Sequence, residues 1–175
     1  MKSGVILFGG PATGKDTVTR ALSRLDARYR LFERLKAGPG RTEGYRMTDS
    51  SELERLDLAG ELVYVNSRYG ARYAIDKPTL TALATEGFIP VVHAGQPQVI
   101  DALREAMPDI HWTVVQLQCT TETARRRIAD RATGDDSERL AAREETPSIL
   151  ADLTIDTDHI QPAQAADLIA DRAAR

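Results

Sequence analysis

The most informative part of this chain is Gly9-Gly10-Pro11-Ala12-Thr13-Gly14-Lys15-Asp16-Thr17. It follows the apolar run Val5-Ile6-Leu7-Phe8, which lacks alternation and therefore predicts a strand buried on both faces. Apolar residues then recur at helical spacing from Val18 to Leu25, so the order is strand, glycine turn, helix. In such a turn successive N–H groups point inward and form an anion site with the helix N-terminus. The stretch therefore predicts a phosphate-binding loop.

The loop departs from the usual pattern at one position. Gly9, Gly14 and Lys15 satisfy G-x-x-x-x-G-K, after which a Ser or Thr hydroxyl usually contacts Mg²⁺. Here that position holds Asp16, and Thr17 follows it. We therefore expect either Asp16 or Thr17 to support the metal. The residues expected to bind the donor nucleotide are Gly10, Pro11, Ala12, Thr13, Gly14, Lys15, Asp16 and Thr17.

Composition limits the class of protein. The chain has 175 residues, of which 42% are hydrophobic and 28% charged, as is ordinary for one soluble globular domain. A formal net charge of −3 gives no general field that would attract nucleic acid or an acidic membrane, so we expect neither partner. The lone Cys119 cannot form an internal disulfide, and the run Val5–Phe8 is too short for a signal peptide or a membrane span. We expect a cytoplasmic monomer or homodimer.

Strand and helix patterns alternate along most of the chain, which predicts an α/β fold with a parallel sheet. One segment interrupts this alternation. Residues 29–36 alternate apolar and charged side chains as one half-buried strand would, and residues 61–66 and 72–75 have the composition of two more strands. We therefore expect residues 29–76 to form a small antiparallel insertion. A polar segment, residues 132–148, follows a helix. It precedes the last strand, predicted over residues 153–156, and the last helix, predicted to begin at Pro162. The expected core comprises residues 1–28, 77–131 and 149–175.

Six arginines form a second informative cluster, namely Arg125, Arg126, Arg127, Arg131, Arg139 and Arg143. Arg127 and Arg131 are four residues apart, so they lie on one helical face, and the segment after Arg131 could hinge a flap. Arginines that close over a transferred phosphoryl group stabilise its charge and exclude water. A solvated helix face is the alternative interpretation. Next to a phosphate-binding loop, the cluster favours a helical lid over residues 132–148.

Three further stretches share the order and spacing of one known family. Residues 43–49, EGYRMTD, resemble its acceptor loop, and Glu61 with Arg68-Tyr69-Gly70 resembles its Glu and Tyr-Tyr-Gly signature. Arg127-Ile128-Ala129-Asp130-Arg131 resembles its lid-entry pattern. Over nearly its whole length the chain resembles a nucleoside monophosphate kinase of the guanylate kinase type. This resemblance implies a P-loop NTPase fold of three α/β/α layers, with residues 29–76 as the acceptor-binding insertion.

The resemblance also implies an ATP- and Mg²⁺-dependent phosphotransferase acting on a small-molecule phosphate acceptor. Tyr45 and Tyr69 would donate hydrogen bonds to the acceptor phosphate. Their cationic partners would be Arg41 and either Arg34 or Lys36. Glu43 or Glu61 would recognise a base or another donor-rich group. The residues expected at the transferred group are Lys15, Arg127 and Arg131, with Arg139 or Arg143.

The chain departs from the family mainly in the acceptor half. Ala71 replaces the usual hydroxyl after Tyr-Gly, and His93-Ala94-Gly95-Gln96 stands where the family tends to place an acidic residue. These departures favour an acceptor other than guanosine monophosphate. His93 could contact that acceptor, act as a base or be a structural polar group. Family members with a Gly-Lys-Asp-Ser/Thr loop include ribose 1,5-bisphosphate phosphokinase-like proteins, so a non-nucleotide acceptor is an alternative.

Two hypotheses from other classes remain. The chain could be a catalytically silent binding module on the same fold, but such a module has no need of Gly14-Lys15 or of the arginine lid. It could also be a nucleotide-hydrolysing switch, but no acidic residue closes a second apolar strand to bind the metal.

Overall fold

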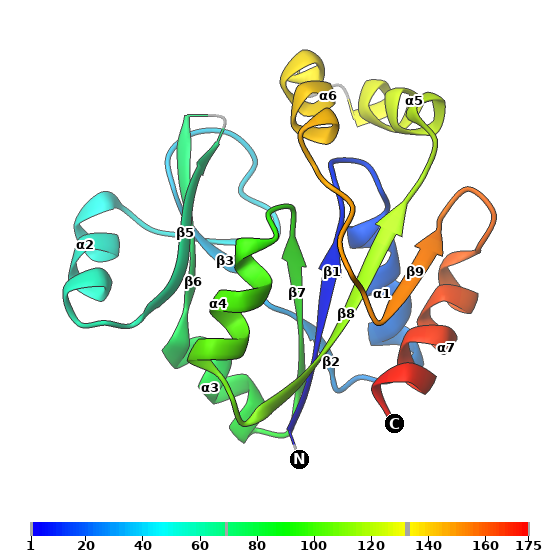
Figure 1. The fold of residues 1–175 in the computed structure, drawn as a ribbon. Coiled ribbons are helices and arrows are strands. Elements are labelled where there is room, and N and C mark those ends of the chain that lie inside the picture. The colour runs from blue at the N-terminus through cyan, green and yellow to red at the C-terminus, as the bar shows by residue number, and fades with distance from the viewer. Residues whose placement is uncertain (1, 69, 132–133, 175) are drawn as a thin grey trace.

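The computed structural model describes residues 2–68, 70–131 and 134–174. Helices and strands alternate through most of this part of the chain (Figure 1). In chain order, they are β1 (Lys2–Phe8), α1 (Lys15–Leu25), β2 (Tyr29–Leu31), β3 (Arg34–Ala37), β4 (Tyr45–Met47), α2 (Ser50–Leu58), β5 (Leu62–Arg68), β6 (Ala71–Asp76), α3 (Lys77–Thr85), β7 (Ile89–Ala94), α4 (Gln98–Ala106), β8 (Ile110–Gln118), α5 (Thr121–Arg131), α6 (Asp136–Glu144), β9 (Leu153–Asp156) and α7 (Pro162–Ala173).

The main sheet has five strands in the order β2-β7-β1-β8-β9, and every neighbouring pair is parallel. β1 lies at the centre, where Val5 is opposite Val91 on one side and Thr113 on the other. Because the strands are parallel, their carboxyl ends share one edge, and the phosphate-binding loop follows β1 at that edge (Figure 1). Open α/β sheets bind their ligands at this edge.

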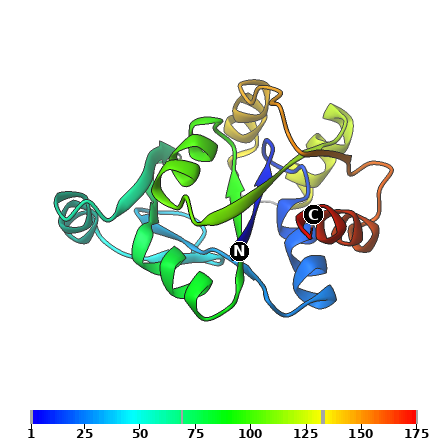
Figure 2. The same cartoon turned by 60° about the horizontal axis from the view of Figure 1, so that its bottom comes forward.

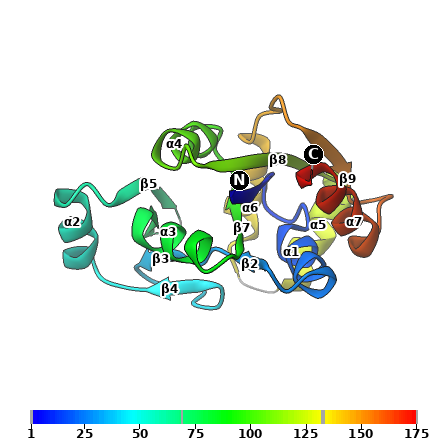
Figure 3. The ribbon, with the colours of Figure 1, turned by 90° about the horizontal axis from the view of Figure 1, so that it is seen from below.

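Helices cover both faces of the main sheet, as Figure 3 shows from below. On one face Ile6 and Phe8 pack in a core with residues of α3 and α4. On the other face Val5 and Leu7 pack with residues of α1 and α7. Successive residues of β1 thus face two different cores, which explains the uninterrupted apolar run. The predicted three-layer α/β/α fold is confirmed.

A second sheet, in the order β4-β3-β6-β5, lies to one side of the main sheet (Figure 2). Leu35, Leu53 and Ala74 lie in its small core against α2. β6 is antiparallel to both β3 and β5, but β4 runs parallel to β3, so the pairing is not wholly antiparallel as predicted.

The prediction of one strand over residues 29–36 is wrong. The structure has two strands there, and β2 joins the main sheet beside β7, whereas β3 begins the second sheet. The change of sheet occurs at Phe32, whose N–H donates to the Val91 carbonyl at 2.9 Å and whose side chain is 2% exposed. The buried ring lies in the same core as Ile75 of β6, so it joins the two sheets.

Two helices, α5 and α6, stand above the carboxyl edge of the main sheet (Figure 1). The Thr120 hydroxyl caps α5 by accepting from the Thr123 N–H at 3.2 Å. α6 lies within the segment predicted as a lid. None of the helices in the described part of the chain is long and apolar enough to cross a membrane.

Candidate active site

A cleft of about 270 Å³ opens at the carboxyl edge of the main sheet. Residues of the phosphate-binding loop, the second sheet and the lid line it. The lining includes three carboxylates, those of Asp16, Glu43 and Asp135. Seven cationic side chains also line it, namely Lys15, Arg34, Lys36, Arg41, Arg68, Arg131 and Arg139. Although the whole chain carries a formal charge of −3, the cleft is strongly cationic and suited to a polyanion.

The phosphate-binding loop is tightly closed on itself. Gly14 has φ +97° and Ala12 has φ +63°, the left-handed region that favours glycine. A Cβ on Gly9 would lie 2.7 Å from both the Leu117 carbonyl oxygen and Thr13 Oγ1, so only glycine fits there. The Thr13 hydroxyl donates to the Gly10 carbonyl at 2.9 Å and braces the turn. The strained loop ends at the N-terminus of α1, where backbone N–H groups are available to an anion.

Lys15 folds back over this loop. Its Nζ donates to the carbonyl oxygens of Gly9, at 2.6 Å, and Gly10, at 2.8 Å. Burial lowers the pKa of this ammonium from 10.5 to about 8, although the charge of Asp16 partly opposes the shift. The ammonium group of Lys15 is therefore still mainly charged at neutral pH. A bound phosphate would supply the negative charge that its two carbonyl partners lack.

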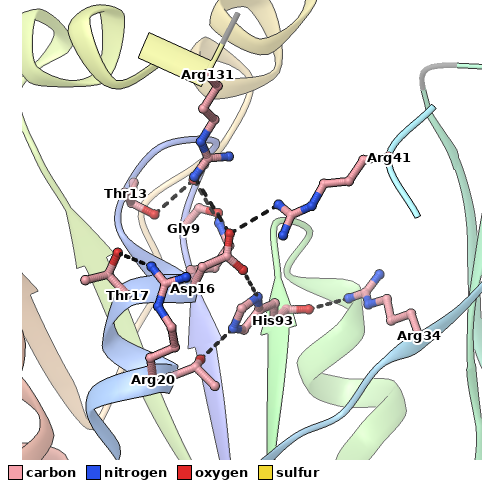
Figure 4. Close-up of polar contacts among 12 residues, drawn as sticks. Gly9, Thr13, Asp16, Thr17, Arg20, Arg34, Arg41, His93 and Arg131 are labelled. Atoms are coloured by element: carbon pink, nitrogen blue, oxygen red, sulfur yellow. Dashed lines mark hydrogen bonds and ion pairs between the residues drawn. The ribbon is translucent and has the colours of Figure 1, made fainter. Parts of the chain in front are cut away.

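Asp16 follows Lys15 in the sequence. Three side chains lie around the carboxylate of Asp16 (Figure 4). Its Oδ2 lies 3.4 Å from an Arg41 nitrogen and 3.7 Å from an Arg131 nitrogen. Its Oδ1 lies 3.8 Å from His93 Nδ1. Burial alone would raise the pKa of Asp16, but the neighbouring His93, Arg41 and Arg131 hold that pKa below its ordinary value. Asp16 is thus ionised at neutral pH.

His93 lies on β7, directly below Asp16 in Figure 4. Its Nε2 is 2.7 Å from Thr19 Oγ1 on α1, and its side chain is 21% exposed. Burial and then the charge of Lys15 lower the pKa of the imidazole from 6.5 to about 3, with Asp16 acting in the opposite direction. His93 is therefore neutral at physiological pH, and the two arginines supply the charge that Asp16 meets there.

Lys36 lies on the acceptor side of the cleft, on β3, and is only 1% exposed. Its Nζ donates to the Arg41 carbonyl at 2.6 Å and lies 5.4 Å and 5.6 Å from the ring centroids of Tyr45 and Tyr73. Burial lowers its pKa. Buried ammonium groups are usually paired with a carboxylate, but no carboxylate in the described part of the chain forms an ion pair with Lys36.

Arg34, at the start of β3, is a second cation of the acceptor side, and its side chain is partly buried. Its guanidinium donates to Asn66 Oδ1 at 3.2 Å and to the His93 carbonyl oxygen. Burial lowers its pKa from 12.5 to about 10, so it remains charged. Within the described residues it too forms no ion pair with a carboxylate. A buried and a partly buried cation, both with neutral oxygen partners, favour an anionic ligand in this part of the cleft.

Some residues expected at the site lie elsewhere. Arg127 donates to the Ala12 carbonyl at 3.0 Å and to the Thr157 hydroxyl at 3.1 Å, so it braces the loop from outside the cleft. Arg143 donates to the Cys119 carbonyl and lines a separate cavity of about 340 Å³, which Gly10 also lines. The structure thus places Arg131 and Arg139, but not Arg127 or Arg143, at the cleft.

The sequence left two choices open, one between Asp16 and Thr17 and one between Glu43 and Glu61. In each pair only one residue lines the cleft. Thr17 is exposed and its hydroxyl accepts from Arg20 at 3.4 Å, whereas Asp16 lines the cleft. Glu61 precedes β5 and its backbone bonds to Leu56 and Lys77, whereas Glu43 lines the cleft. Tyr45 lines it as well, and Tyr69 is outside the described residues.

Sequence interpretation missed several residues that line the cleft. Tyr73 of β6 is the clearest, because its ring lies 5.4 Å from that of Tyr45 and close to the Lys36 ammonium. Asn66 and Arg68 lie toward the end of β5, and Arg68 lies 3.6 Å from Glu145 of the lid segment. The polar ending of the predicted strand over residues 61–66 was the available signal for Asn66.

Asp16 fits a magnesium site. Mg²⁺ is usually held by one or two carboxylates, with substrate phosphates and waters completing the octahedron. No cluster of three or more metal-ligating side chains exists among the described residues, but the carboxylate of Asp16 faces the cleft next to Lys15. Asp16 would therefore hold the metal together with the donor phosphates.

Neither a family model nor a curated protein matches this chain. Solved structures do match. A guanylate kinase from Anaplasma phagocytophilum has a TM-score of 0.63 and 17% identity, covering 99% of this chain and 88% of its own. The APS kinase of Mycobacterium tuberculosis, solved with AMPPNP and APS, has a TM-score of 0.56 and 15% identity, covering 99% of both chains. A sugar kinase from Janibacter has a TM-score of 0.53 and 17% identity, covering 96% of this chain and 92% of its own. The chain has the fold of P-loop kinases.

Proposed function

We propose that the chain is an ATP- and Mg²⁺-dependent phosphotransferase whose acceptor is a small molecule that already carries phosphate. One observation carries the proposal. The cleft has a phosphate-binding loop on one side, and on the other the buried Lys36 and the partly buried Arg34, neither of which forms an ion pair with a carboxylate of the described residues. An anionic donor would be neutralised at the phosphate-binding loop, and an anionic acceptor would be neutralised by Arg34 and Lys36. The likeness to kinases of three kinds supports the class of reaction.

The donor half would work mainly by positioning and charge stabilisation. Lys15 and the loop amides would hold the donor phosphates, and Asp16 would hold the Mg²⁺, which neutralises charge on the transferred group when bound. Arg131 and Arg139 would contact the equatorial oxygens from the lid. When an oxygen of the acceptor's phosphate is the nucleophile, it is already anionic and the reaction needs no general base. The neutral, hydrogen-bonded His93 would then orient groups in the cleft rather than accept a proton.

The acceptor half would recognise a phosphate with Arg34, Lys36 and Arg41, assisted by the Tyr45 hydroxyl. For the rest of the acceptor, Glu43 is the available carboxylate of the cleft, because Asp16 and Asp135 form ion pairs with arginines. Glu61, the other residue expected to recognise a base of the acceptor, does not line the cleft. We therefore propose a nucleoside monophosphate or, as the alternative, a phosphorylated non-nucleotide metabolite.

An acceptor screen with ATP labelled at the γ-phosphate tests this proposal. The panel pairs each phosphorylated compound with its dephosphorylated form, across nucleosides, sugars and small metabolites. We expect label in at least one phosphorylated compound and little in its partner. Equal transfer to both members of a pair would contradict the assignment of Arg34 and Lys36.

A catalytically silent module is the second candidate, and calorimetry separates it from a kinase. We expect saturable binding of ATP in the presence of Mg²⁺. If no nucleotide bound, the silent module would be favoured over the kinase.

A further inference from the structure

We infer that Asp16 holds Arg41 and Arg131 in the free protein and releases both when it binds the metal of the donor nucleotide, so that the donor binds before the acceptor. This inference rests on the proposed function. It concerns the order of binding, which neither the fold nor the phosphate-binding loop determines.

The geometry of one oxygen atom is the main observation. The same Oδ2 of Asp16 lies 3.4 Å from Arg41 and 3.7 Å from Arg131. Arg41 comes from the loop between β3 and β4, on the acceptor side, and Arg131 is the last residue of α5, at the lid. Figure 4 shows the two guanidinium groups approaching Asp16 from different sides. A single carboxylate oxygen therefore connects the donor loop, the acceptor loop and the lid.

His93 lies beside the other oxygen of this carboxylate. Its Nδ1 lies 3.8 Å from the other oxygen, Oδ1, and its Nε2 is 2.7 Å from the Thr19 hydroxyl one turn further along α1. The imidazole is thus placed between α1 and the end of β7, where it leaves Oδ2 to the arginines. The Ser or Thr more usual at position 16 would be neutral, so it would attract neither arginine as an ion pair.

Asp16 cannot serve both sets of partners fully. A carboxylate that coordinates a divalent cation donates its electron density to that cation, and the arginines beside it are repelled by the new positive charge. Arg41 and Arg131 would then be free to contact phosphate oxygens. If binding of the donor nucleotide must break the contact between Asp16 and Arg41, the cost of breaking it weakens that binding. Without Arg41 this cost is absent, so the donor nucleotide should bind more tightly.

This thermodynamic linkage can be tested with AMPPNP, because it predicts that removing a cationic side chain increases the affinity for an anionic ligand. An arginine that merely attracts phosphates should weaken nucleotide binding when removed. If Arg41 competes with the metal for Asp16, Arg41→Ala should instead tighten the binding of AMPPNP with Mg²⁺. We expect tightening of roughly two- to fivefold, the range that loss of one partly exposed ion pair allows. Calorimetry measures the dissociation constant directly, and a thermal melt checks that the variant is folded.

Arg68→Ala is the matched control, because Arg68 lines the same cleft but pairs with Glu145 instead of Asp16. It should leave binding unchanged or weaken it. In an Asp16→Ser background, and in EDTA without metal, Arg41→Ala should no longer tighten binding. Unchanged or weaker binding by Arg41→Ala, or tightening that persists without metal or without Asp16, would overturn the inference alone. Failure of the unmodified protein to bind AMPPNP with Mg²⁺ would overturn the proposed function as well.

Discussion

At the scale of the residue, the site is set by which way neighbouring side chains point. Asp16 and Thr17 are adjacent in sequence, yet α1 directs Asp16 into the cleft and leaves Thr17 on the surface. Consecutive residues on a helix differ by about 100° in direction, and the sequence alone did not show which of the two faces the ligand. The spacing of Arg127 and Arg131 predicted a shared helical face, but their different partners depend on how α5 packs.

His93 provides a test at this scale. The pKa of His93 is lowered from 6.5 to about 3 in the folded protein. Between these two pH values the imidazole therefore binds a proton in the unfolded chain but not in the folded one. This contribution to stability is present above pH 6.5 and is lost as the pH falls toward 3. The free energy of unfolding should therefore fall by up to about 1.4 kcal/mol per pH unit from this group.

Denaturant titrations at pH 7, 6 and 5 measure that slope. His93→Gln, which keeps a polar group but does not titrate, should lose less stability over this range than the unmodified protein. Equal slopes in the two proteins would contradict a neutral, partly buried His93.

At the scale of the element, the acceptor side depends on a change of sheet that local pattern does not reveal. The alternation over residues 29–36 has the same phase on both sides of Phe32, so the sequence predicts one strand where there are two. Which sheet each strand joins depends on distant partners, Ile89–Val91 for β2 and Arg72–Ala74 for β3. By contrast, the strand predicted over residues 153–156 and the helix predicted from Pro162 are confirmed, because local signals bound them.

This change of sheet buries Lys36, and substituting it should separate stability from function. Lys36→Met keeps the length of the side chain and removes a buried charge that forms no ion pair with a carboxylate of the described residues. We expect the free energy of unfolding to stay equal or to rise by about 1 kcal/mol, because an uncompensated charge no longer has to be buried. The KM for the acceptor should rise at least about tenfold, while the affinity for AMPPNP stays unchanged.

Steady-state kinetics, denaturant titration and calorimetry check the three quantities. A variant that is clearly less stable, with an unaltered acceptor KM, would assign Lys36 to the scaffold.

At the scale of the whole molecule, positive charge is concentrated where three parts of the fold meet. The chain as a whole is acidic, but the loop after β1, the second sheet and the lid together line a cleft with many cationic side chains. The parallel order of strands could be predicted from the sequence, as could a phosphate-binding loop at the carboxyl edge. The side chains that contact the cations of the cleft could not be predicted. Arg34 meets Asn66, and Lys36 meets Tyr73, only after residues far apart in the chain have packed together.

The most direct measurement follows the γ-phosphate of labelled ATP during incubation with the acceptor panel, for the unmodified protein and two lysine variants. Lys15→Ala removes the ammonium over the phosphate-binding loop, and Lys77→Ala removes an exposed lysine of α3. We expect label in a phosphorylated acceptor. Its transfer should be at least about a hundredfold slower with Lys15→Ala and unchanged with Lys77→Ala, while all three proteins remain folded. Label released only as inorganic phosphate, or transfer that persists in Lys15→Ala, would contradict this expectation.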